Sequence, residues 1–191
     1  MTKNPPATVK IWDLPVRLGH WSLALCFALA YGLQGDHPRL HGHAGYTIGL
    51  LILFRVVWGF AGTQHARWRD FWPAPGAVIA HLKQLYAGPL PPSSGHDPAG
   101  AAMICALLCS LTATVLSGLV LFAMEGSGPL AGTALGHTVS QWPGSSVARW
   151  HAWLADVSLA LVVLHIMGVA AASHRQRQNL VRAMLTGRKP R

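Results

Sequence analysis

Acidic residues are scarce in this sequence. Its 191 residues include only 6 Asp and Glu against 15 Lys and Arg, and charged residues make up 11% of the chain against 51% apolar residues. This balance argues against an ordinary soluble domain. Cysteines are few as well, and all three (Cys26, Cys105 and Cys109) fall in apolar runs, where they act as small hydrophobes and form no disulfide framework.

Four long apolar stretches dominate what is present. They cover about residues 16–33, 43–61, 100–124 and 150–172, and each approaches the roughly 20 residues that a helix needs to cross a bilayer. The polar start "MTKNPPATVKIWDLP" lacks a signal-peptide pattern, so the first stretch is expected to remain in the mature protein. Backbone groups must be paired in lipid. The sequence therefore predicts an all-α, integral membrane four-helix bundle, with residues 1–191 as a single transmembrane domain.

The net charge of +9 suits either nucleic acid or a membrane face, and its distribution decides between them. Twelve Lys and Arg lie in the N-terminal segment, the loop 62–99 and the C-terminal tail, whereas the other two loops hold only Arg39 and Arg149. The positive-inside rule then places both termini and the loop 62–99 in the cytoplasm and the loop 125–149 in the periplasm of a bacterial inner membrane. No soluble fold is left to bind nucleic acid.

Histidines near the ends of these stretches form a pattern. His151 and His165 are 14 residues apart, so they share one helix face and are separated by about 21 Å along the axis. His20 is expected near the depth of His165, and His41 near the depth of His151. Polar groups inside a membrane mark function by default, and the four histidines are expected to form two pairs across the bundle.

Two facing imidazoles are the axial ligands of a b-type haem, and a bundle interior is a dry cavity for it. No "CxxCH" occurs, which excludes covalent attachment. The prediction is two non-covalent haems b, with His20 and His165 binding the cytoplasmic-side iron and His41 and His151 the periplasmic-side iron. Zinc, nickel and proton-relay sites fit less well, because no carboxylates or thiolates accompany the histidines. Structural histidines remain an alternative.

Arg55 lies 14 residues after His41 and so projects from nearly the same helix face in the cytoplasmic half. A buried guanidinium needs an anion, and no acidic residue is expected at that depth on a facing helix. A haem propionate would supply the anion. Snorkelling to the interface is the other explanation.

Several segments in order resemble the bacterial cytochrome b-561 and nickel-hydrogenase cytochrome b subunit family over nearly the whole chain. They are "DLPVRLGHW", "LHGHAGYTIGLLILFRVVWGFAG", "GHDPAGAAM", "WHAWLADVSLALVVLH" and "QNLVRAMLTG". The resemblance implies that the ligands are His20, His41, His151 and His165, and that Arg17 and Arg55 lie beside the haems. It also implies that His96 belongs to a recurring turn. His43 would face away from His41 by about 200° and is left out of the ligand set.

Bis-histidine iron has no open position for a substrate, so one-electron transfer is the expected task. The first hypothesis is electron transfer between the quinone pool, with ubiquinone as a candidate substrate, and a periplasmic redox partner such as a c-type cytochrome or hydrogenase-like enzyme. The resemblance also suggests a superoxide oxidase that reduces ubiquinone. A haem-free membrane anchor is a third hypothesis, and small residues in the third span allow a homodimer (Gly100, Ala101, Ala102, Ser110 and Ala113).

Overall fold

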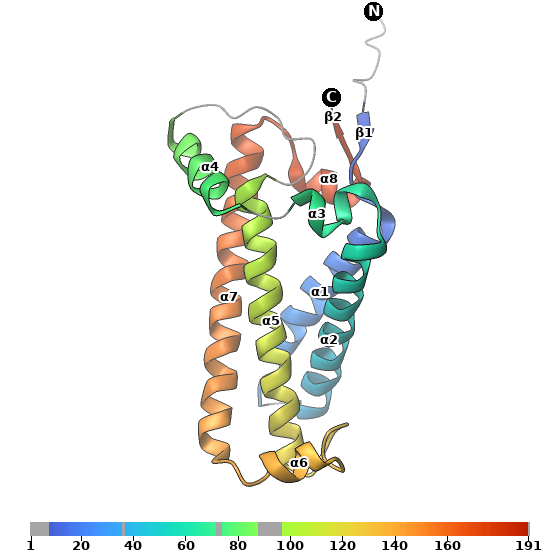
Figure 1. Cartoon of the computed structure of the whole chain (residues 1–191), viewed down its shortest axis with the longest axis vertical. Helices are drawn as coiled ribbons and strands as arrows, with labels where there is room; N and C mark the ends of the chain where they lie inside the picture. Colours follow the sequence, from blue (N-terminus) through green and yellow to red (C-terminus); the bar gives the residue numbers. More distant parts are fainter. Residues whose placement is uncertain (1–7, 36, 72–73, 88–96, 191) are drawn as a thin grey trace, which may run out of the picture. The chain divides into compact units, whose positions relative to one another are not determined.

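Four long helices dominate the computed structural model, which describes residues 8–35, 37–71, 74–87 and 97–190. They are α1 (Leu14–Gly32), α2 (Pro38–Ala61), α5 (Pro98–Met124) and α7 (Gly144–Arg175), and their order can be followed by colour in Figure 1. All four expected stretches are therefore helical. The all-α prediction is confirmed.

The helix limits differ from the apolar limits mainly at the N-terminal ends. α2 begins at Pro38 instead of residue 43, and α7 begins at Gly144 instead of residue 150. Proline is favoured in a first helical turn, where its missing N–H is not needed, so the backbone becomes helical before the apolar run begins. His41 and His151 consequently lie inside their helices. α5 begins at Pro98, two residues before the expected 100, and Asp97 Oδ1 accepts a hydrogen bond from Gly100 N–H at 2.6 Å at this helix start.

Three described helices, α2, α5 and α7, are long and apolar enough to cross a membrane. The helix α1 is not among them. It has 19 residues, and its first turns contain the polar side chains Arg17 and His20. That α1 also crosses the membrane remains a prediction.

The shorter elements connect these helices. A 3-10 helix, η1 (Gln64–Ala66), is followed by α3 (Trp68–Phe71) and α4 (Pro75–Ala87) in the second loop, and α6 (Ala134–Val139) lies in the third. The chain ends with α8 (Leu180–Thr186) and β2 (Arg188–Pro190), which pairs antiparallel with β1 (Thr8–Lys10), as Figure 1 shows. These two short strands are the β-structure among the described residues.

Two compact units divide the chain. The first unit comprises Met1–Trp21, Phe54–Cys105 and Val163–Arg191, and the second comprises Ser22–Leu53 and Ala106–Val162. Each of the four long helices thus has one part in the first unit and the other part in the second. His20 and His165 belong to the first unit, and His41 and His151 belong to the second.

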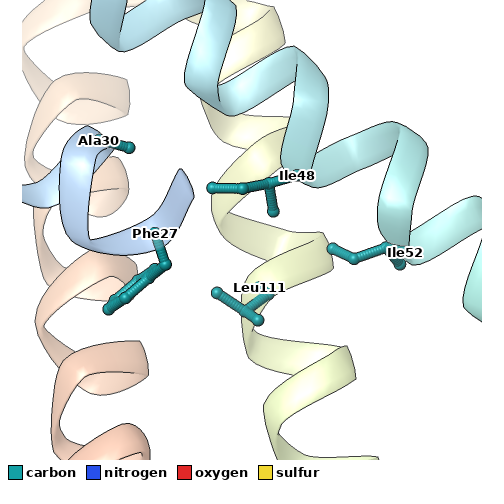
Figure 2. Packing of buried hydrophobic residues seen from close by; sticks show 5 residues of the cluster. All are labelled: Phe27, Ala30, Ile48, Ile52 and Leu111. Carbon is teal, nitrogen blue, oxygen red and sulfur yellow. The ribbon is translucent and has the colours of Figure 1, made fainter. Parts of the chain in front are cut away.

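An apolar cluster forms the core of the second unit. The buried members, labelled in Figure 2, are Phe27 and Ala30 of α1, Ile48 and Ile52 of α2 and Leu111 of α5. Partly buried side chains of α7, Leu159 and Val162, pack against this cluster. All four long helices therefore contribute to the core of this unit.

Contacts between the two ends of the chain organise the first unit. Arg17 donates hydrogen bonds to the carbonyl groups of Met184 (3.3 Å) and Leu185 at the end of α8. Gly187 ends α8 with a φ of 78°, and its carbonyl accepts from Ile11 N–H at 2.8 Å. A side chain at Gly187 would lie 2.6 Å from the Trp12 carbonyl oxygen, so both the turn and the close approach require glycine.

Candidate haem-binding site

The four predicted histidines meet in two pairs, one in each unit. The ring centroids of His41 and His151 are 6.0 Å apart, and those of His20 and His165 are 6.3 Å apart. Two imidazoles that bind one metal ion from opposite sides, each through a nitrogen about 2 Å from the metal, have ring centres about 6 Å apart. Both pairs match this spacing.

His41 has a defined tautomer. Its Nδ1 lies 2.8 Å from the carbonyl oxygen of Ala30. A carbonyl only accepts hydrogen bonds, so Nδ1 carries the proton and Nε2 keeps its lone pair. This is the usual state of a metal-binding histidine, whose other ring nitrogen donates to a carbonyl or carboxylate.

His151 is held in the same way by two residues of α5. Its Nδ1 lies 2.9 Å from Ser117 Oγ and 3.1 Å from the Thr114 carbonyl oxygen. Ser117 Oγ donates its own proton to the Thr114 carbonyl at 2.8 Å, so both oxygens accept from the Nδ1–H of His151. The Nε2 lone pair again stays available.

Two glycines provide room around the pair His41 and His151. A Cβ atom at Gly118 would lie 3.1 Å from Cε1 of His151, and one at Gly42 would lie 2.8 Å from the Phe122 ring. A side chain at either position would have to displace its neighbour. Gly118 therefore allows the His151 ring to lie directly against α5.

A cavity of about 330 Å³ opens beside His41 and His151. It lies at the lower end of the range of about 300–1,000 Å³ typical of small-molecule sites. Its wall is mainly apolar, with a few polar groups at the ends of the helices. The lining includes Phe27, Tyr31, Gln34, His41, Tyr46, Ile48, Leu111, Phe122, Glu125 and His151.

The first-unit pair has one unusual feature. His20 Nδ1 is buried and has no hydrogen-bond partner. Buried polar atoms are normally satisfied, and an exception in a native fold needs an explanation. A group that binds to this ring is one explanation.

The two predicted arginines differ in their surroundings. Arg17 binds the backbone at the end of α8, as described above. Arg55 donates to the Ala66 carbonyl at 3.2 Å, and its guanidinium carbon lies 4.7 Å from the centre of the Trp68 ring.

Asp13 is a buried carboxylate that interacts electrostatically with Arg55, and the sequence reasoning missed it. It is 8% exposed and accepts hydrogen bonds from Thr63 Oγ1 (2.7 Å), Trp58 Nε1 (3.0 Å) and Val16 N–H (2.8 Å). Burial alone would raise the pKa of Asp13, but these hydrogen bonds and the charge of Arg55 hold it below its usual value. Asp13 precedes the first apolar stretch, which is why the search for acids within the spans did not find it.

The remaining sequence expectations have simple outcomes. His43 is exposed, and its Nδ1 lies 2.6 Å from the Arg39 carbonyl oxygen. His96 lies outside the described residues. Ala101, one of the small residues on α5 considered for a homodimer, is only 2% exposed.

Clusters of three or more His, Cys, Asp or Glu that could hold a metal ion do not occur among the described residues. The candidate ligands come in twos. Two axial imidazoles suit iron whose other positions are filled by a macrocycle, so the spacing of both histidine pairs, the tautomers of His41 and His151 and the cavity beside them fit haem.

Comparison with known proteins gives a consistent picture. Residues 11–187 match the family model described as prokaryotic cytochrome b561. The chain is 25% identical to a protein named probable Ni/Fe-hydrogenase B-type cytochrome subunit from Azotobacter chroococcum, over 94% of this chain and 87% of that one. It is 26% identical to a protein of the same name from Cupriavidus necator, over 93% and 85%. No solved structure gives a significant match. Because the family model covers nearly all of its length, the chain belongs to the prokaryotic cytochrome b561 family.

Proposed function

We propose that this protein binds two haems b and passes electrons between the quinone pool and a periplasmic redox partner. The family makes it a b-type membrane cytochrome of a bacterial inner membrane. The number of haems, the quinone and the partner are the proposed part. The observation that supports two haems best is that two histidine pairs, one in each unit, have ring centroids 6.0 and 6.3 Å apart.

The protein's part in this function is to hold the iron ligands in place. His41 and His151 present Nε2 because the Ala30 carbonyl, the Thr114 carbonyl and Ser117 fix the proton on Nδ1. The apolar core behind them excludes water. When bound, a bis-histidine haem supplies reversible one-electron chemistry with no open position on the iron.

The arrangement of the chain in the membrane is also part of this proposal. In this proposal α1 joins the other three long helices as a fourth span, and both termini lie in the cytoplasm. The pair His20 and His165 then belongs to the cytoplasmic side, and the pair His41 and His151 to the periplasmic side. The excess of Lys and Arg in the termini and the loop 62–99 supports this orientation.

Both arginines share the first unit with His20 and His165. Arg55 is the better candidate to balance a haem propionate, because Arg17 already donates to two backbone carbonyls at the end of α8. Asp13 already offsets part of the charge of Arg55, which weakens the original reason for a propionate partner. The contacts of Arg17 support a structural role at the end of α8.

The partner is proposed as a c-type cytochrome or a hydrogenase-like enzyme. The relatives named as Ni/Fe-hydrogenase cytochrome subunits favour the second. A partner is required in either case, because electrons must enter and leave a protein that has no substrate position on its iron.

The haem-to-protein ratio and the reduced-minus-oxidised spectrum of the purified protein test the proposal. We expect two low-spin b haems. His20→Ala and His165→Ala should remove one chromophore, and His41→Ala and His151→Ala the other. His43→Ala is the matched control, because His43 is exposed and only two residues from His41, and it should keep both haems.

A single haem, or a pairing different from this one, would overturn the ligand assignment, and spectra unchanged by His165→Ala would favour a haem-free anchor. The quinone half is tested separately with a quinol analogue. Reduction of the protein no faster than that of free haem would refute it.

A further inference from the structure

The orientation of His41 depends on the end of another helix. α1 ends at Gly32, and the Leu33 N–H closes the last turn on the Leu29 carbonyl at 3.0 Å. Later carbonyls of α1 have no donor within the helix. The Ala30 carbonyl is one of them, and it accepts the hydrogen bond from His41 Nδ1. The position of this helix end therefore decides whether His41 finds its partner.

Tyr31, the next residue, ties this end of α1 to α7. Its hydroxyl donates to Asp156 Oδ1 at 2.8 Å, and its side chain also lines the cavity. Asp156 follows His151 by five residues on the same helix, which is about one and a half turns. A single contact thus connects the segment that orients His41 to the helix that carries His151.

Asp156 is otherwise hard to explain. It is the one acidic residue between Trp150 and Ala172, in a helix long and apolar enough to cross a membrane, and it is exposed there. A carboxyl group in such a position is costly, and by default it marks function. Its recorded partner is Tyr31, so the function is sought at that contact.

We propose that Tyr31 and Asp156 are positioning residues for His41: their hydrogen bond holds the end of α1 where the Ala30 carbonyl fixes the His41 tautomer. The inference rests on the proposed function, because it concerns how a proposed ligand is held. Asp156 lies outside the lining of the cavity, whereas Tyr31 forms part of its wall. Their effect is carried by the backbone of residues 30–31 to the ring of His41.

Three variants test this inference in the purified holoprotein. The readouts are the midpoint potential and the dissociation rate of the haem that His41→Ala removes, followed by transfer to excess apomyoglobin. Tyr31→Phe should speed dissociation about 2- to 12-fold, the range expected for losing one hydrogen bond, and should shift the potential of that haem alone. Asp156→Leu should do the same. Asp156→Asn should behave as wild type, because its amide oxygen still accepts from Tyr31.

Combining Tyr31→Phe with Asp156→Leu should add nothing to either single change, since both remove the same bond. Tyr46→Phe is the matched control: it removes another hydroxyl from the wall of the same cavity, and it should change both readouts less than Tyr31→Phe.

The inference is overturned if Tyr31→Phe equals Tyr46→Phe, if Asp156→Asn is as harmful as Asp156→Leu, or if Tyr31→Phe loosens both haems equally. Failure of the proposed function looks different. In that case wild-type protein lacks two haems, or His41→Ala retains both.

Discussion

Ser117 offers a direct measure of how the tautomer of His151 is held. Ser117→Ala removes the acceptor 2.9 Å from His151 Nδ1 but leaves the Thr114 carbonyl at 3.1 Å. One of two acceptors is lost, so the change should cost about as much as one hydrogen bond, roughly 0.5–1.5 kcal/mol. This energy corresponds to about 2- to 12-fold faster haem dissociation. We expect a value near the lower end of this range, because the Thr114 carbonyl still accepts from His151 Nδ1.

The assay is haem transfer from the purified protein to excess apomyoglobin, in which the haem proposed to bind to His20 and His165 serves as an internal reference. Ser110→Ala is the matched control. Ser110 lies on the same helix and donates to the Leu107 carbonyl three residues back, as Ser117 does to Thr114, but no contact with a histidine is recorded for it. Equal dissociation rates for the two variants would refute the reasoning.

Substitutions at three further positions give separate predictions. Gly118→Ala should moderately weaken binding of the haem proposed at His151, and Gly118→Val should weaken it severely, because a Cβ at Gly118 would lie 3.1 Å from the His151 ring. Absorption spectra at matched protein concentration measure the haem content. A normal haem content in Gly118→Val would contradict this prediction. Asp13 has a lowered pKa, so its stabilising effect is present above the unfolded value of about 3.9 and is lost as pH falls through the folded value. Asp13→Asn should therefore remove acid sensitivity in that window, as followed by unfolding in detergent, whereas an unchanged pH profile would count against the network. Gly187→Ala should lower the free energy of unfolding by about 1–3 kcal/mol, since alanine is strained at this φ of 78° and meets the Trp12 carbonyl; thermal unfolding identical to wild type would refute this.

The long helices were predictable because apolar runs of sufficient length have few alternatives. The residues at which these helices begin were harder to predict. α2 begins at Pro38 and α7 at Gly144, several residues before the apolar run that indicates each span. The histidine pairs were predictable because His151 and His165, 14 residues apart, share one helix face, and because His41 and His20 were expected at matching depths on other helices. That they bind haem iron stays a prediction.

The partners of the histidines could not be predicted. Two of them, at Ala30 and Thr114, are backbone carbonyls, and every residue carries one. Ser117 is 34 positions from His151 in the sequence, and nothing in its local pattern separates it from Ser110. Arg17 was expected beside a haem because the family resemblance implied it, but its contacts are with the end of α8, which only the folded chain brings near.

The pairing of β1 with β2 has a consequence for biosynthesis. Thr8 meets Pro190 and Lys10 meets Arg188, so nearly the whole chain must leave the ribosome before the first strand can find its partner. Arg17 likewise cannot form its hydrogen bonds until the carbonyls of Met184 and Leu185 have been synthesised. Closing so long a loop is entropically costly. The first turn of α1, which contains Arg17 three residues before His20, should therefore be among the last parts of the first unit to fold. A chain truncated after residue 183 would lack both the carbonyls that bind Arg17 and the strand β2 that pairs with β1.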